Sequence, residues 1–301
     1  MTTKARHSLS AYLDDLQSSG RVSFAREEAL KTLEVSRPAL LKAAARLQKQ
    51  TKLLSPRHGF YVIVPAQFHR WGAPPPDWYI DALMRHEDRP YYVGLLKAAE
   101  IHGASHQAVM EYQIITDKQI PRLTVGRSIL AFYFRKTLSA VADGIEQHQT
   151  SAGYIKLSCP ELTALDLLRY PHAAGGIDHI ATVLAELGDK LDPAKLGYLA
   201  TAFEKNVIQR LGFLLDLLGH QIAARHILRV LENTSRFTWT ELEQPPRDID
   251  PDLLPPVTER DRRWRVIVRR PVEPDELSQG CTLQRGQRKR PGPKNGRSNK
   301  I

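Results

Sequence analysis

The stretch AAEIHGASHQ (residues 98–107) places one glutamate and two histidines close together, with His102 and His106 four residues apart. Two histidines at this spacing can bind zinc when a continuous helix turns both toward the metal. Gly103 follows His102 directly, however, and predicts that a helix ends there. The zinc-binding pattern H-E-x-x-H also requires a glutamate immediately after the first histidine, and this sequence has none at that position. We therefore expect hydrogen bonding at a helix end here, and no metal.

Glu161 and Asp166 are a second pair of candidates, because two carboxylates can hold a magnesium ion or carry out acid–base catalysis. Glu161 follows Pro160 in the first turn of a predicted helix, where the helix dipole favours a negative charge. Asp166 lies between two leucines, and we expect it to be partly buried against Arg169 or a more distant cation. Neither a phosphate-binding loop nor a nucleophile motif accompanies them, so the sequence favours a protein that is not an enzyme and has no cofactor. One alternative stays open: a metal-dependent enzyme that processes nucleic acid, with Glu161 and Asp166 as metal ligands.

The segment SRPALLKAAARLQKQ (residues 36–50) indicates a different chemistry, the binding of a polyanion. Ser36 is a suitable N-cap for a helix, and Pro38 falls in the first turn, where its missing N–H does no harm. At about 100° per residue, an apolar side of this helix comprises Leu40, Leu41, Ala44 and Leu47. The opposite side comprises Ala39, Lys42, Ala43, Arg46, Lys49 and Gln50. Small residues let the backbone come close and long cations reach phosphates or guanine edges, so this side suits the major groove of DNA.

The side chains that would contact DNA divide by type. Arginines can make bidentate contacts with bases, whereas lysines are better suited to backbone phosphates. The predicted DNA-binding residues are Ser36, Arg37, Lys42, Arg46, Lys49, Lys52, Arg57 and His58. A solubilising role is the alternative for Lys49 and Lys52.

The elements that must position this helix follow a recognisable order. Residues 9–20 predict a first helix, residues 22–24 a short extended segment, and residues 25–33 a second helix. Two β-rich runs, residues 52–54 and 60–64, surround the turn SPRHG after the third helix. Three helices followed by a hairpin are the order of a winged helix-turn-helix, and we assign it to residues 1–64.

Charge separates the ends of the chain from its middle. Residues 1–64 hold eleven Lys/Arg and five Asp/Glu, and residues 277–301 hold seven Lys/Arg and no Asp/Glu, in a chain of net charge +10. Basic ends suggest that they meet a polyanion. No stretch approaches the roughly 18 consecutive apolar residues that a membrane span needs, so we expect a cytoplasmic protein with no membrane partner. Cys159 and Cys281 are far apart, and we expect no disulfide.

The remainder of the chain predicts a linker, a larger domain and a tail. Three consecutive prolines mark residues 65–76 as a Pro-rich linker. In residues 77–275 we expect a helix near residue 79, a strand YYV, a helix GLLKAAEIHG, and then the β-rich runs MEYQIIT, PRLTVG, SILAFYF and GYIKLS. Four helices follow residue 160, and RWRVIVRR is a last strand. The fold class is α+β, with a mostly antiparallel sheet and helices packed after it. Residues 276–301 form a basic tail that we expect to be disordered.

Three stretches of the larger domain resemble the AbiEi antitoxins, the regulators of bacterial AbiE type IV toxin–antitoxin, or abortive-infection, operons. They are YYVGLLKAAEIHGASHQ, SCPELTALDLLRYPHAAGGIDHIATVLAEL and QRLGFLLDLLG. The resemblance covers roughly residues 8–275. It implies an N-terminal winged helix that represses its own operon by binding inverted repeats in operator DNA. It also implies a C-terminal domain that counteracts a nucleotidyltransferase-like toxin without forming a stable complex with it.

The resemblance makes the histidine-bearing stretch part of an antitoxin-domain motif. The residues that we single out in this domain are Tyr92, Glu100, His102, His106, Gln107, Glu161, Asp166 and Arg210. A purely structural role is the alternative for each of them. The basic tail departs from the pattern of the family, and the resemblance implies no role for it.

Overall fold

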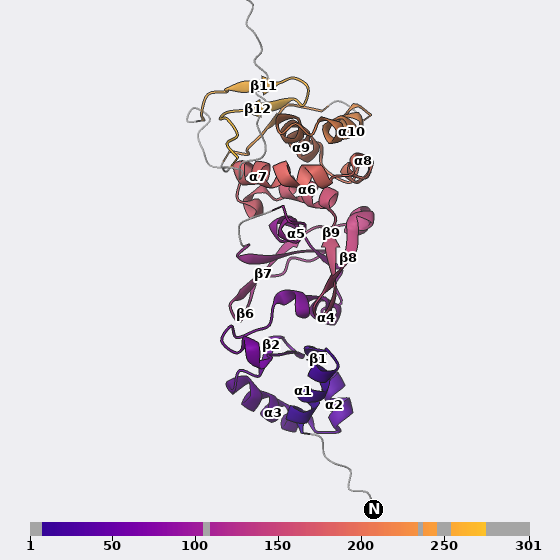
Figure 1. The fold of residues 1–301 in the computed structure, drawn as a ribbon, viewed down its shortest axis with the longest axis vertical. Coiled ribbons are helices and arrows are strands. Elements are labelled where there is room, and N and C mark those ends of the chain that lie inside the picture. The colour runs from indigo at the N-terminus through magenta and orange to yellow at the C-terminus, as the bar shows by residue number, and fades with distance from the viewer. Residues whose placement is uncertain (1–7, 105–108, 234–236, 246–253, 275–301) are drawn as a thin grey trace, which may run out of the picture.

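The computed structural model describes residues 8–104, 109–233, 237–245 and 254–274 of the 301-residue chain. The molecule is elongated, and its parts follow one another along the long axis in chain order (Figure 1). A helical N-terminal unit occupies one end, a six-stranded sheet lies next to it, and a group of helices and a small sheet occupy the other end.

The N-terminal unit contains the three helices and the hairpin that its sequence predicts. Its elements are α1 (Leu9–Ser18), β1 (Ser23–Ala25), α2 (Arg26–Leu33), α3 (Arg37–Lys49), β2 (Leu53–Arg57) and β3 (Phe60–Ile63). The strands form an antiparallel sheet in the order β1-β3-β2. Ser36 caps α3 as expected, because its hydroxyl oxygen accepts a hydrogen bond from the Ala39 amide at 3.4 Å.

The hairpin turn is shorter than the sequence predicts. We expected SPRHG to form the turn, but Ser55, Pro56 and Arg57 belong to β2, and the chain reverses at His58 and Gly59. Gly59 has φ +78°, a conformation that a residue without a side chain adopts easily. Pro56 is tolerated in the strand because β2 is an edge strand.

Both faces of this small sheet are covered, so that all four residues of β3 are buried. Phe24, Tyr61 and Ile63 pack against the three helices. Val22, Phe60 and Val62 join a second cluster with side chains from residues 79–84 of the larger body, which are Tyr79, Ile80, Leu83 and Met84. The continuous apolar run FYVIV therefore reflects a strand covered on two sides.

The proline-rich segment between the two parts is in contact with the protein. It contains the short 3-10 helices η1 (Ala66–Phe68) and η2 (Pro76–Trp78), and Ala73, Pro74 and Pro76 are buried. The Phe68 ring meets the Trp78 ring edge-on at 5.1 Å. A linker was expected here, and its residues are fixed by these contacts.

The central sheet has six strands in the order β6-β7-β5-β4-β9-β8. Their bounds are β4 (Tyr91–Val93), β5 (Glu111–Thr116), β6 (Leu123–Val125), β7 (Ser128–Phe134), β8 (Ile145–Thr150) and β9 (Gly153–Ser158). Three of its five pairings are antiparallel, in agreement with the expected mostly antiparallel sheet. The other two, β5 with β7 and β4 with β9, are parallel and were not predicted. The edge strand β8 was not predicted, since IEQHQT is polar and most of it is exposed.

Helices cover both faces of this sheet. On the side of the N-terminal unit lies α4 (Ile80–His86), and on the other side lie α5 (Leu95–Ile101) and α6 (Pro160–Arg169) (Figure 1). Beyond them follow α7 (Ile177–Leu187), α8 (Pro193–Ala200), α9 (Lys205–Leu217) and α10 (Gln221–Glu232). The short 3-10 helix η3 (Ser139–Gly144) lies between β7 and β8, η4 (Pro171–Ala174) between α6 and α7, and η5 (Gly188–Lys190) between α7 and α8. The four helices expected after residue 160 are present, and α10 is an additional one. None of the helices in the described ranges is long and apolar enough to cross a bilayer.

A small sheet closes the far end, with the strand order β10-β12-β11. Its strands are β10 (Thr240–Glu241), β11 (Glu259–Asp261) and β12 (Val266–Val268), and the last of these is the strand predicted within RWRVIVRR. Trp264 is fully buried between this sheet and α9. The basic tail from residue 276 onward lies outside the described residues.

Candidate nucleic-acid interface and buried polar residues

The third helix presents cations to solvent at the free end of the molecule. Lys42, Arg46 and Lys49 are exposed, whereas Leu40 and Ala44 point into the N-terminal core. The helices of this unit face away from the larger body (Figure 1), so that the outer side of α3 is open. This arrangement meets the basic requirement of a helix that enters a DNA groove.

The exposed side of α3 is rotated relative to the expectation. Leu41 was assigned to the apolar side but is 41% exposed, and Ala43 was assigned to the outer side but is partly buried. The buried row is formed by Leu40, Ala44 and Leu47, and a residue directly after Leu40 lies about 100° around the helix from it. Leu41 therefore borders the cationic surface.

The cations of α3 differ from the other arginines of the N-terminal unit in having no carboxylate partner. Arg21 pairs with Glu28 at 2.6 Å and Arg26 with Glu27 at 3.3 Å. Lys42, Arg46 and Lys49 form no ion pair with any residue in the described part of the chain, and α3 itself contains no acidic residue. Their charge is therefore available to an external anion.

The other predicted DNA-binding residues are divided between solvent and the larger body. Arg37 and Lys52 are exposed. Arg57, near the hairpin tip, lies 3.7 Å from Glu87, which directly follows α4. His58 accepts a hydrogen bond from Arg26 through Nε2 at 3.3 Å, and its carbonyl oxygen lies 3.1 Å from Nε2 of His86. The tip thus contacts the second body, and a role in DNA binding stays a prediction for these two residues.

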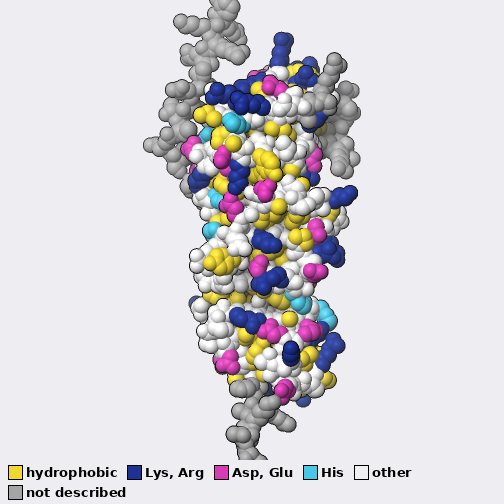
Figure 2. All heavy atoms as spheres, turned by 90° about the vertical axis from the view of Figure 1, so that its right-hand side faces the viewer, with side chains coloured by type: hydrophobic (Ala, Val, Ile, Leu, Met, Phe, Trp, Pro, Cys, Tyr) yellow, Lys and Arg dark blue, Asp and Glu magenta, His cyan; other side chains and the backbone are white. Residues whose placement is uncertain are grey.

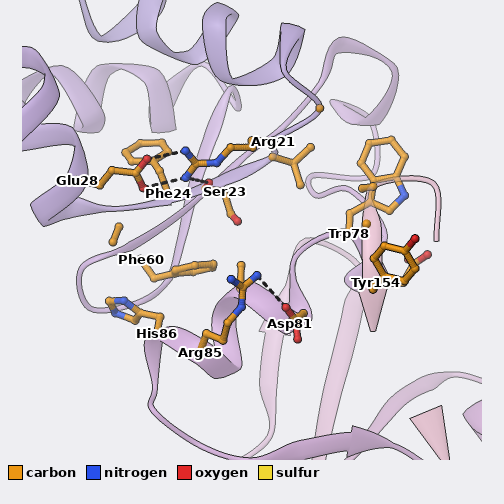
Figure 3. A pocket seen from close by; sticks show the side chains of 17 residues that line it. Arg21, Ser23, Phe24, Glu28, Phe60, Trp78, Asp81, Arg85, His86 and Tyr154 are labelled. Carbon is orange, nitrogen blue, oxygen red and sulfur yellow. Dashed lines mark hydrogen bonds and ion pairs between the residues drawn. The ribbon is translucent and has the colours of Figure 1, made fainter. Parts of the chain in front are cut away.

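A cleft of about 650 Å³ separates the N-terminal unit from the larger body on one side. Figure 3 shows the Arg21–Glu28 pair on one wall and the Arg85–Asp81 pair on another, with Trp78 and Tyr154 at one end. Arg85 lies 2.8 Å from Asp81. Four of the charges that line the cleft are therefore neutralised in pairs, whereas Asp77, which also lines it, forms no ion pair with a described residue.

Two residues singled out in the larger domain meet in its interior. The Tyr92 hydroxyl donates a 2.7 Å hydrogen bond to Asp166, and Arg135 lies 3.2 Å from the other carboxylate oxygen. All three are buried, and Arg135 also donates to the Ala202 carbonyl at 3.2 Å. Burial raises the pKa of Asp166 to about 6, although Arg135 and Tyr92 favour the charged form.

Arg135 was not identified from the sequence. A partner for Asp166 was expected to be Arg169 or a distant cation, and the distant cation is correct. Arg169 instead lies 2.8 Å from Glu204. One signal in the sequence could have identified Arg135 as the partner. This arginine directly follows the apolar run SILAFYF, and a charged residue beside a buried strand needs either an ion-pair partner or access to solvent.

The remaining predicted residues lie at separate places. Glu161 is buried in the first turn of α6 and accepts a hydrogen bond from the Asp192 amide at 2.7 Å. Arg210 donates to the Glu241 carbonyl at 2.8 Å, and burial lowers its pKa. Glu100 pairs with Lys97 at 2.8 Å.

The histidine-bearing stretch is described only in part. His102 ends α5, and its Nε2 lies 2.7 Å from the Ser158 carbonyl oxygen at the end of β9. His106 and Gln107 lie outside the described residues. Within the residues that the structure describes, no group of three or more His, Cys, Asp or Glu side chains could hold a metal ion.

The fold defines a two-part protein in which a helical unit with a free cationic helix is fixed on a larger α/β body. Residues 92–217, from β4 to the end of α9, match the family model described as the AbiEi antitoxin C-terminal domain. The match confirms the resemblance to the AbiEi antitoxins over these residues.

The fold is similar to that of a solved structure over most of the chain. The crystal structure of the RV2827C protein from Mycobacterium tuberculosis superposes with a TM-score of 0.64 at 15% sequence identity, over 86% of this chain and 90% of that chain. This likeness shows the fold alone. A comparison with curated proteins gave no match.

Proposed function

We propose that this chain is an autoregulating antitoxin, in which residues 9–64 form a winged helix-turn-helix and bind DNA. The observation that carries the DNA-binding part is α3, whose exposed cations Lys42, Arg46 and Lys49 form no ion pair in the described part of the chain. Its position at the open end of the molecule supports the same proposal. The order of helices and strands is that of a winged helix.

The DNA that we propose as target is the operator of the protein's own operon. The resemblance to the AbiEi antitoxins implies inverted repeats there, and each repeat would accept one copy of the N-terminal unit. Binding at the promoter represses transcription of the operon, so that the antitoxin limits its own synthesis in the cytoplasm.

The domain formed by residues 92–217 counteracts a cognate nucleotidyltransferase-like toxin in this proposal. Its family match supports an antitoxin role. We propose the type IV mode, in which the toxin's effect is opposed without a stable complex. We assign no catalytic role to Glu161 or Asp166, because both are buried and each accepts a hydrogen bond from another group of the protein.

A gel-shift titration with the DNA directly upstream of the gene tests the DNA-binding part. The parent should bind, and the double variant Lys42→Ala/Arg46→Ala should bind much more weakly, because both cations face the proposed DNA. Asp14→Ala/Asp15→Ala on the exposed side of α1 is the matched control and should bind at least as well as the parent. Equal binding by the parent and the α3 variant would refute the assignment.

A further inference from the structure

A tryptophan beside the N-terminal unit is unusually exposed. Trp71 leaves 59% of its surface to solvent, more than any other tryptophan in the described residues. The guanidinium of Arg127, in the turn between β6 and β7, lies 5.5 Å from its ring centre. An exposed indole under an arginine offers a flat apolar surface and a cation side by side.

The backbone around this pair is held tightly. The Arg127 amide donates a 3.2 Å hydrogen bond to the Trp71 carbonyl, which joins the two segments. Gly126 has φ +60°, and a Cβ there would lie 2.7 Å from the Cβ of Ala73, so a side chain would push the segments apart. The segments that carry the indole are thus fixed before binding, and the protein loses little conformational entropy when a partner binds there.

The segments that carry the pair contain no acidic residue. Residues 35–76 hold seven Lys/Arg and no Asp/Glu, and residues 118–142 hold five Lys/Arg and no Asp/Glu. Arg70 and Arg127 are both exposed, and neither forms an ion pair with a described residue. On the face shown in Figure 2, by contrast, Lys/Arg and Asp/Glu alternate along the middle of the molecule.

The pair adjoins the proposed DNA-binding helix through one strand. β2 follows α3 and contacts it, and β2 also contacts β6, whose end is next to Gly126 and Arg127. In Figure 1, α3 and β6 lie on the same side of the molecule. The strand β2 therefore links α3 to the turn that carries Arg127.

We propose that Trp71, Arg70 and Arg127 form a second contact with the DNA that α3 binds, on the backbone that flanks the site of α3. This rests on the proposed function of α3. The two guanidinium groups neutralise phosphates, and the indole ring packs on the sugar between them. Charge complementarity selects a polyanion, and the connection through β2 selects the duplex already held by α3.

Salt-dependent titrations of the full chain with its upstream DNA test the proposal. Arg127→Ala should weaken binding several-fold and lower the slope of log affinity against log salt by about 1. Trp71→Ala should weaken binding with the slope kept, and Trp71→Phe should restore part of the affinity. Trp239→Ala, an exposed tryptophan beside β10, is the matched control and should bind as the parent does.

The outcomes separate this proposal from the one on which it rests. If Trp71→Ala and Arg127→Ala bind like the parent while Lys42→Ala/Arg46→Ala loses binding, the second contact is refuted and the α3 assignment stands. If the parent does not bind the DNA, both fail. If the Trp71 and Arg127 variants lose affinity only for single-stranded RNA, the surface serves another nucleic acid and the proposal is overturned.

Discussion

Asp166 illustrates what a single residue reveals in the sequence and what it hides. Its position between leucines predicts burial, and burial predicts a cationic partner. The identity of that partner depends on which strand end lies above α6, and Arg135 is 31 residues away in the chain. Local sequence carries no information on that distance, so the residue could be named and its partner could not. The same holds for Glu161, whose bond to the Asp192 amide joins two helices.

The raised pKa of Asp166 predicts a particular dependence of stability on pH. In the folded protein the Asp166 carboxyl keeps its proton up to about pH 6, whereas in the unfolded chain it loses the proton near pH 4. Ionisation of Asp166 therefore favours the unfolded state as the pH rises between these values. The free energy of unfolding of the parent, minus that of Asp166→Asn, should fall by roughly 3 kcal/mol from pH 4 to pH 7. Urea titrations at several pH values measure it. A difference that stays constant over this range would show that the pKa is not raised.

At the scale of elements, local rules predicted most helices and strands, and tertiary contacts decided the rest. The third helix and its Ser36 cap follow from side-chain chemistry. The rotation of this helix about its axis does not follow from the sequence, because an orientation with Leu41 buried would give an equally regular apolar pattern. The strand β8 escaped prediction because its polar residues need the neighbouring strand β9 to become ordered. The pairing of β5 with β7 in parallel requires the chain to pass through β6, which no short pattern indicates.

The packing of α9 on the small C-terminal sheet predicts a strong effect of one methyl group. A Cβ at Gly212 would lie 2.1 Å from the Trp264 ring, and this ring is fixed by the hydrogen bond from its Nε1 to Asp216 at 2.7 Å. Gly212→Ala should therefore lower the free energy of unfolding by about 1–3 kcal/mol, despite the better helix propensity of alanine. Thermal or chemical unfolding measures this.

Gly197 in α8 provides the matched control for that substitution. The nearest atom to a Cβ at Gly197 is 3.6 Å away, which is ordinary contact. Gly197→Ala should leave stability unchanged or raise it by up to about 1 kcal/mol. Similar effects of the two substitutions would contradict the close packing of Trp264.

At the scale of the whole molecule, the N-terminal unit and the larger body share a hydrophobic cluster. Phe60 and Val62 of β3 lie in it together with Leu83 and Met84 of α4. The sequence predicted two parts and a linker between them. It could not predict that the outer face of the small sheet is covered, because FYVIV fits a strand buried by any partner.

This shared cluster predicts that the two parts unfold together. Phe60→Ala should lower the free energy of unfolding by about 3–5 kcal/mol and speed amide hydrogen exchange in α4. Phe24→Ala removes a ring from the cluster on the opposite face of the sheet and should speed exchange in α1–α3 while leaving α4 less affected. Unchanged exchange in α4 of Phe60→Ala would show that the parts are independent.

In the proposed complex with operator DNA, the covered face of the three-stranded sheet also limits the orientation of the protein on the duplex. A DNA-binding unit on a flexible linker could change its orientation relative to the rest of the protein. Here the shared cluster fixes the larger body to the N-terminal unit, and the body extends along the long axis of the molecule. A second copy on a neighbouring repeat must then bind without a steric clash with the body of the first copy. Under this proposal we expect the spacing of the repeats to depend on the width of the protein body as well as on the pitch of the double helix.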